Sequence, residues 1–224
     1  QKKMIGNHYE IFGFTPEEKF HVIAGIKAVS LNDEKPNGDN FSMGKVREGR
    51  FVSMIADGMG TGIDANKESR KMIEVMEELL SAGITEDQSI QLLRSMMVLR
   101  PEKERYATLD LFQFDLFAGV GTFFKMGACP CILKRKDRVE ILQMETIPLN
   151  LLLQKEHVPF YRKKMESEDI LVMLSDGAFD GFSENGLEII AQYLKEMDVV
   201  RPQTIVDGLY EKITKTKGFV KKDD

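Results

Sequence analysis

Apolar side chains recur with helical spacing in two neighbouring stretches of the chain. The apolar positions of the first stretch are Met72, Ile73, Met76, Leu79 and Leu80. Their i, i+3 and i+4 spacing indicates a helix, and Gly83 marks its C-terminal end. Thr85 and Gln88 form the capping-box pattern that opens a second helix, which ends before Pro101. The sequence therefore predicts an antiparallel helix hairpin over residues 65–99.

Other apolar positions alternate with polar ones, or run without interruption, as they do in β-strands. We expect a hairpin of two strands at 41–46 and 51–56, an alternating strand at 120–126, and a strand buried on both faces at 170–174. These strands lie on either side of the predicted helix hairpin in the sequence. The pattern therefore predicts strands both before and after that hairpin.

Further elements are expected at both ends of the sequence. Two helices are predicted near 184–197 and 202–216. Residues 1–20 are predicted to form an N-terminal extension with a short helix after Thr15, and residues 21–30 to form a strand. The order of strands, helix pair, strands and helix pair indicates an α+β domain with helices segregated from antiparallel sheets.

Composition narrows the possible classes of function. The chain has 224 residues, enough for one domain with a buried core, and its net charge is −5. A negative balance argues against nucleic acid as a partner, and no apolar run reaches the roughly 18 residues needed to cross a membrane. Cys129 and Cys131 are too close in sequence for a mutual disulfide, so we expect reduced structural thiols in a cytosolic protein.

Two apolar strands each end in an Asp-Gly pair. Residues 52–56 lead into Asp57 and Gly58, and residues 171–175 lead into Asp176 and Gly177. A buried strand fixes the carboxylate, while the glycine lets the backbone approach an ion and leaves its carbonyl available as a ligand. One Asp-Gly pair alone is more often an ordinary turn. Two pairs that both end apolar strands favour a metal site.

The spacing within the first strand hairpin adds a third carboxylate. Asp39 and Asp57 are each nine residues from Glu48, at the centre of the connecting turn. In an antiparallel pair this symmetry places the two aspartates opposite each other, with Cβ atoms about 5 Å apart. Carboxylates so close together repel unless they share a proton or a cation. Oxygen ligands of this kind suit Mg²⁺ or Mn²⁺ better than zinc.

The glycine-rich segment after Asp57 has two interpretations. Gly58, Gly60 and Gly62 alternate directly before the first long helix. Such a segment can bind an anion at a helix start, or it can simply allow a tight turn from strand to helix. It lacks the spacing of the dinucleotide-binding fingerprint. The sequence alone leaves both interpretations open.

Several short motifs, taken in order, resemble a known family. They are residues 37–42 (NGDNFS), 56–62 (ADGMGTG) followed by Glu68 and Ser69, 107–111 (ATLDL), 125–130 (KMGACP) and 175–177 (SDG). Together they resemble the PP2C-type (PPM) bacterial serine/threonine phosphatases and, within that family, the sporulation stage II protein E phosphatase domain. The resemblance covers residues 21–224. It implies a sandwich of two antiparallel sheets flanked by helix pairs.

The resemblance also implies a reaction and its ligands. It implies that water, activated by two Mn²⁺ or Mg²⁺ ions, hydrolyses phosphoserine or phosphothreonine without a covalent phosphoenzyme. Asp57 would bridge the ions, the Gly58 carbonyl and Asp39 would serve one ion, and Asp176 the other. The family's late aspartate motif matches 223–224, with Asp223 as ligand. The implied partners are a phosphorylated anti-sigma-factor antagonist as substrate and a second copy of the chain, bound through the regulatory helices.

The resemblance also bears on the extent of the chain. Family members continue past Asp224 into a final strand and carry membrane spans upstream. We therefore expect a cytosolic fragment of a membrane-anchored protein, lacking that strand and making no membrane contact itself. Two alternatives to the phosphatase are a catalytically inactive or signal-gated partner-binding module of the same fold, and another two-metal hydrolase such as a nucleotide phosphodiesterase. The absence of histidine near the aspartate motifs argues mildly against the latter.

Overall fold

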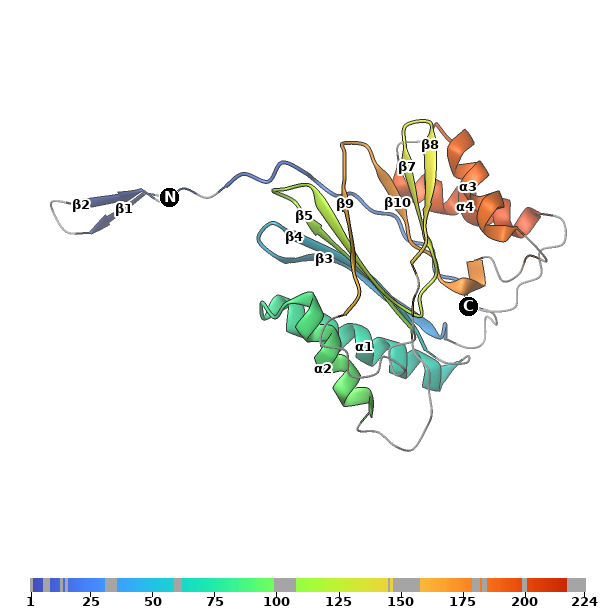
Figure 1. Ribbon diagram of the computed structural model, residues 1–224, viewed down its shortest axis with the longest axis horizontal. Coiled ribbons are helices and arrows are strands. Elements are labelled where there is room, and N and C mark those ends of the chain that lie inside the picture. Colours follow the sequence, from blue (N-terminus) through green and yellow to red (C-terminus); the bar gives the residue numbers. More distant parts are fainter. Residues whose placement is uncertain are drawn as a thin grey trace.

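The computed structural model describes residues 2–5, 9–12, 14, 16–30, 36–58, 62–98, 108–144, 146, 158–178, 182, 185–198 and 201–216. Two antiparallel β-sheets pack face to face, and a pair of helices covers the outer face of each (Figure 1). This four-layer arrangement confirms the α+β sandwich predicted from the sequence.

The first sheet has five strands in the order β3-β4-β5-β6-β9. They are β3 (Asp39–Arg47), β4 (Arg50–Asp57), β5 (Thr108–Asp115), β6 (Val120–Met126) and β9 (Tyr161–Lys164). Side chains alternate along β4, as its period-two pattern predicts. Val52, Met54 and Ala56 are buried against the helices, whereas Ile55 and Asp57 lie on the face toward the second sheet. The predicted hairpin at 41–46 and 51–56 is therefore confirmed, with longer strands.

The second sheet has three strands in the order β10-β7-β8. They are β10 (Ile170–Val172), β7 (Cys131–Arg135) and β8 (Arg138–Leu142). Phe112 and Phe123 from the first sheet pack against Leu133 of the second, in a core that excludes water between the sheets. This shared apolar core holds the two sheets together face to face.

Each sheet is covered by one of the predicted helix pairs. On the first sheet lie α1 (Ile63–Ser81) and α2 (Glu86–Val98), and on the second lie α3 (Gly186–Glu196) and α4 (Pro202–Lys215). Gly83 ends α1 with a φ of 85°, a left-handed conformation that favours glycine. The Gln88 backbone N–H donates to the Thr85 hydroxyl at 3.4 Å, which confirms the predicted cap of α2. None of the described helices is both long and apolar enough to cross a membrane.

The N-terminal segment differs from the prediction in two respects. Residues 21–30 form no strand, and residues 16–18 form no helix. The Glu18 carboxylate instead binds the side chain of Lys45 and accepts a hydrogen bond from the Gly49 N–H at 3.0 Å. Ile26 exchanges two hydrogen bonds with the Gln203 side chain of α4, at 3.0 and 3.1 Å. The Gln203 side chain thus satisfies the backbone N–H and carbonyl of Ile26, which a sheet edge would otherwise do. We call the segment of residues 18–26, which contacts the sandwich without pairing at a sheet edge, the strap.

The start of the chain holds a hairpin that the sequence did not predict. β1 (Lys2–Ile5) and β2 (Tyr9–Phe12) pair with each other, and they lie away from the sandwich in Figure 1. The division into an extension at 1–20 and a domain from 21 onward stays a prediction. The strap, however, contacts the sandwich from residue 18 onward.

Candidate metal centre

The predicted pairing of two aspartates across the first hairpin is confirmed. Asp39 on β3 and Asp57 on β4 are register partners, so their side chains share one face of the sheet. The register slips only at Lys45 and Arg47, next to the turn. Because the slip lies beyond the strand positions that carry the aspartates, it leaves their pairing intact.

A glycine holds the end of β4 against the start of α1. A Cβ built on Gly58 would lie 2.3 Å from the carbonyl oxygen of Ala65, so only glycine fits at this approach. Gly62 precedes α1 with a φ of 87°. Gly60 lies outside the described residues. The glycines therefore serve the tight strand-to-helix turn, while the anion-binding interpretation stays untested.

A polar network that the sequence did not reveal ties α1 to the start of β3. The Asn40 side-chain amide donates to the Ser69 hydroxyl at 2.9 Å and to the Asn66 carbonyl at 3.1 Å. Ser69 is fully buried and donates to the Gly38 carbonyl, while the Asn66 amide donates to the Asn37 carbonyl at 2.6 Å. This network fixes the backbone on both sides of Asp39. Its only signal in the sequence is that polar residues occupy positions facing a helix.

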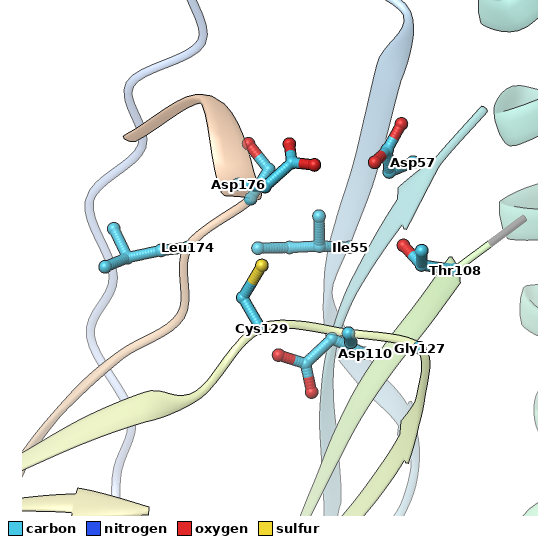
Figure 2. A pocket seen from close by; sticks show the side chains of 10 residues that line it. Ile55, Asp57, Thr108, Asp110, Gly127, Cys129, Leu174 and Asp176 are labelled. Atoms are coloured by element: carbon cyan, nitrogen blue, oxygen red, sulfur yellow. The ribbon is translucent and has the colours of Figure 1, made fainter. Parts of the chain in front are cut away.

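Asp176 reaches the same region from the other sheet. The predicted strand at 170–174 is shorter, because β10 ends at Val172, and Asp176 does not end it directly but begins a short 3₁₀ helix, η2 (Asp176–Ala178). Asp57 and Asp176 both line a small cavity of about 20 Å³ at one end of the sandwich. In Figure 2 their carboxyl groups lie at the same end of this pocket. The complete lining is Ile55, Asp57, Thr108, Asp110, Gly127, Ala128, Cys129, Leu174, Ser175 and Asp176.

The other predicted ligands lie outside this lining. Asp39 is adjacent to Asp57 through its register pairing, and Gly58 follows Asp57 directly. Asp223 lies outside the described residues, so its predicted role as a ligand is untested. The structure therefore brings together carboxylates from both sheets, with Asp39 and Gly58 next to one of them.

The donors in the pocket suit a hard divalent cation. Asp57 and Asp176 offer carboxylate oxygens, and Mg²⁺ is commonly held by one or two carboxylates together with water and phosphate oxygens. Over the described ranges, no group of three or more His, Cys, Asp or Glu side chains is placed to hold a metal ion by itself. The pocket therefore fits an ion that completes its shell with backbone carbonyl, water or substrate oxygens.

A charged pair that the sequence did not single out lies beneath the pocket. Asp110 on β5 and Lys125 on β6 are register partners, and their side chains are only 3% and 1% exposed. The Lys125 amine lies 2.6 Å from an Asp110 carboxylate oxygen. Each charge is flanked by apolar neighbours in its strand, Asp110 by two leucines and Lys125 by Phe124 and Met126, and that is the signal by which the sequence could have shown the pair.

Comparison with solved structures identifies the fold. The structure of the PP2C phosphatase domain and a fragment of the regulatory domain of SpoIIE from Bacillus subtilis matches with a TM-score of 0.84 at 30% identity, over 92% of this chain and 62% of that one. The manganese-presoaked SpoIIE phosphatase domain matches with a TM-score of 0.50 at 28% identity, over 93% of both chains. The sandwich with aspartates at its strand ends is therefore a PP2C-type phosphatase fold.

Sequence comparison then defines the family. The family model of Stage II sporulation protein E (SpoIIE) matches residues 47–224, and the chain belongs to this family. It is 33% identical to Stage II sporulation protein E of Priestia megaterium, over 95% of this chain and 36% of the relative. It is 30% identical to that of Bacillus subtilis, over 97% of this chain and 26% of the relative. Phosphoserine phosphatase RsbU of Bacillus subtilis is 22% identical, over 89% of this chain and 60% of RsbU.

Proposed function

We propose that this domain is a metal-dependent protein-serine/threonine phosphatase. One observation carries the proposal: Asp57 and Asp176 come from different sheets and line one pocket at the end of the sandwich. Asp57 is held there by β4 and Asp176 by η2, so the approach of two negative charges is built into the fold. Two carboxylates without a cation between them would repel each other. The match to SpoIIE phosphatase domains supports this choice of reaction.

In this proposal the ligands are Asp39, Asp57, Gly58, Asp176 and Asp223. Two ions would be held by these groups: Asp57, the Gly58 carbonyl and Asp39, the last directly or through water, would serve one, and Asp57, Asp176 and Asp223 would serve the other. Mn²⁺ or Mg²⁺ held by these oxygens would lower the pKa of bound water and neutralise charge on the phosphoryl group. The chain's own contribution is to hold its carboxylates rigidly, and the network of Asn40 and Ser69 does this for Asp39.

The size of the pocket favours a protein substrate. Sites that enclose a nucleotide-sized molecule usually measure about 300 Å³ or more. The cavity here is about 20 Å³, enough for little more than one water molecule. A phosphorylated side chain on a protein surface can present its phosphoryl group at the mouth of such a cavity. We propose a phosphorylated anti-sigma-factor antagonist as this substrate; the similarity to RsbU, which is named a phosphoserine phosphatase, supports phosphoserine as the group hydrolysed.

The proposal includes a setting for the reaction. We place this domain in the cytosol, because neither Cys129 nor Cys131 forms a disulfide and reduced thiols are typical there. A membrane anchor would belong to the remainder of the full-length protein.

We also propose a homodimer through α1 and α2. Leu92 and Met96 support it, because they lie one turn apart on α2 and are 46% and 42% exposed.

One observation favours a second candidate, the inactive or signal-gated module of the same fold: Gly58, next to Asp57, packs closely against Ala65 in the first turns of α1. In a signal-gated domain the helices α1 and α2 would have to move before the site is complete. In an inactive domain the metal would not bind at all.

Hydrolysis of a phosphoserine peptide with and without Mn²⁺ separates these functions. We expect turnover that requires Mn²⁺ and falls by orders of magnitude in Asp57→Asn and in Asp176→Asn. Asp137→Asn is the matched control, because Asp137 is exposed in the turn between β7 and β8, and it should behave as wild type. Full activity in excess chelator would refute the proposal, as would a trapped phosphoenzyme. Mn²⁺ binding without turnover would favour the signal-gated module.

A further inference from the structure

Beneath the pocket, a buried group of polar atoms joins the two sheets. We call it the inter-sheet cluster, and it consists of the side chains of Asp110, Lys125 and Cys131 and the carbonyl of Cys129. Lys125 donates to the Asp110 carboxylate at 2.6 Å and also to the Cys129 carbonyl. The Cys131 thiol donates to the same Asp110 oxygen at 3.4 Å. Asp110 and Lys125 belong to the first sheet, whereas Cys131 begins β7 of the second.

Burial and the ion pair act in opposite directions on the charged groups of the cluster. Burial raises the pKa of the Asp110 carboxyl group, against the opposing effect of Lys125. Burial also disfavours the ammonium form of Lys125, but the adjacent Asp110 carboxylate raises the pKa of the amine above its usual value. Burial raises the pKa of the Cys131 thiol far above its usual range, so the thiol stays protonated and can donate. The raised pKa values of Lys125 and Cys131 keep both groups in the protonated forms that donate these hydrogen bonds.

Stability does not explain why the cluster is charged. A buried ion pair gains little over well-packed apolar side chains of the same volume, because removing two charges from water is costly. Among the described residues, one Asp110 oxygen is buried and has no hydrogen-bond partner, which adds to that cost. An expensive charged group directly beneath a pocket is more readily explained by a role in that pocket.

The cluster lies on a short structural path between Asp57 and Asp176. Asp110 is the register partner of Ile55, two residues before Asp57. On the other side, Lys125 binds the Cys129 carbonyl, and the chain runs from Cys129 into β7. β7 pairs with β10, and the chain continues from β10 to Asp176. In Figure 2 the Asp110 carboxyl group points away from Asp57 and Asp176, so it does not reach the reacting atoms itself. Its effect on the site must pass through the backbone.

We propose that Asp110 and Lys125 are positioning residues, which set the separation of Asp57 and Asp176 by tying the first sheet to the chain that enters the second. The hydrogen bond from Lys125 to the Cys129 carbonyl holds the loop at 127–130, which forms one wall of the pocket. This inference rests on the proposed metal site. It assigns a function to two residues that contact neither the metal nor the substrate.

The test replaces both charges at once with apolar side chains of similar size, in the variant Asp110→Leu/Lys125→Met. We expect a folded protein with a melting temperature close to wild type, because the apolar pair can pack in the same space. The Kd for Mn²⁺, measured by titration calorimetry, should rise about 10- to 100-fold, as it does when groups supporting metal ligands are removed. The kcat should fall to a similar extent, while KM for the phosphopeptide changes little.

A matched control lies at the other end of β7. Arg135 binds Asp169 through two hydrogen bonds, at 2.7 and 2.8 Å, and the Asp169 side chain is 2% exposed. Four residues of strand place this pair about 13 Å from Cys131. Arg135→Met/Asp169→Leu should leave the Kd for Mn²⁺ within twofold of wild type. Equal weakening of Mn²⁺ binding in both double variants would overturn the inference, because any loss of a buried pair would then have the same effect.

Two further measurements keep the test decisive. Asp110→Asn/Lys125→Gln keeps the hydrogen-bonding groups without the charges, and it should recover much of the lost Mn²⁺ affinity if positioning is the role. In metal-free protein, alkylation of Cys129 followed by mass spectrometry should be faster in Asp110→Leu/Lys125→Met, because the loop is no longer held. Unchanged Mn²⁺ affinity and unchanged Cys129 alkylation in the folded double variant would overturn the inference.

Failure of the proposed function has a different signature. If the wild-type protein binds Mn²⁺ but hydrolyses no phosphopeptide, the phosphatase proposal fails. The positioning role would still stand if Mn²⁺ affinity fell in Asp110→Leu/Lys125→Met and not in Arg135→Met/Asp169→Leu.

Discussion

Gly58→Ala is the substitution for which the structure gives the most direct estimate of effect. The added methyl group would lie 2.3 Å from the Ala65 carbonyl oxygen and 2.8 Å from its carbon. Ordinary contact begins at 3.4 Å, so β4 and α1 must separate by about 1.1 Å. The backbone angles of Gly58 lie outside the left-handed region, so alanine is conformationally allowed. The effect is therefore purely steric.

This displacement falls directly on the proposed site. Gly58 follows Asp57, and Ala65 lies in the first turns of α1. A misplacement of about 1 Å at a catalytic group can lower the rate about 100-fold. Overpacking a buried position costs about 1–3 kcal/mol of folding free energy. We therefore expect Gly58→Ala to remain folded, with kcat about 100-fold lower at saturating Mn²⁺.

The assay compares phosphopeptide turnover and urea denaturation in Gly58→Ala and Gly44→Ala. Gly44 lies on β3 of the same sheet, and a Cβ built there meets nothing within 4 Å. Gly44→Ala should therefore keep wild-type turnover and equal or slightly greater stability, since alanine restricts the unfolded chain. A kcat for Gly58→Ala within about threefold of wild type would refute the reasoning. It would mean that the contact with Ala65 does not control the geometry of the site.

Two other regions give predictions of a different kind. Met72 and Leu93 lie in the core between the helix hairpin and the first sheet. If the hairpin is a regulatory switch, Met72→Ala and Leu93→Ala should change kcat or Mn²⁺ affinity more than peptide binding. A change in melting temperature alone would mean that these residues serve only packing. In the strap, the hydrogen bond from Lys45 lowers the pKa of Glu18 below its usual 4.5. A carboxylate with a lowered pKa stabilises the fold above its unfolded pKa and loses that contribution as the pH falls through its folded pKa. Denaturation should show Glu18→Gln less stable than wild type at pH 7, with the gap closing as the pH falls below the usual pKa of Glu, and a gap that does not change with pH would contradict the pairing.

Local sequence patterns were sufficient to predict structural elements wherever the interacting residues are close in sequence. The pairing of Asp39 with Asp57 followed from counting outward from the turn, because a two-strand hairpin leaves few alternative registers. The α1–α2 hairpin followed from helical spacing with Gly83 and Thr85 as its end signals. In each case the interactions that specify the element lie within about twenty residues of one another.

Non-local partners explain the errors. Residues 21–30 alternate in a strand-like way, but a strand also needs a free sheet edge, and the sequence does not show where one lies. The described segment instead binds Gln203 on α4, far along the chain. The roles of Asp110 and Lys125 escaped prediction for the same reason. The alternating pattern shows on which face of its strand each residue lies, but only the packing of the second sheet shows that this face is buried.

The same distinction applies within the proposed site. Local rules specify each carboxylate separately, since Asp57 ends β4 and Asp176 begins η2 a few residues after β10. Neither strand specifies the separation of the two carboxylates, which depends on how one sheet docks on the other. Apolar packing between Phe112, Phe123 and Leu133 holds the two sheets together. It fixes their relative position only loosely, because hydrophobic contacts are non-directional. Hydrogen bonds have preferred lengths and angles, so a directional tie between the sheets adds what the apolar core cannot supply. The inter-sheet cluster is placed to provide this tie, at the end of the sandwich where the carboxylates lie.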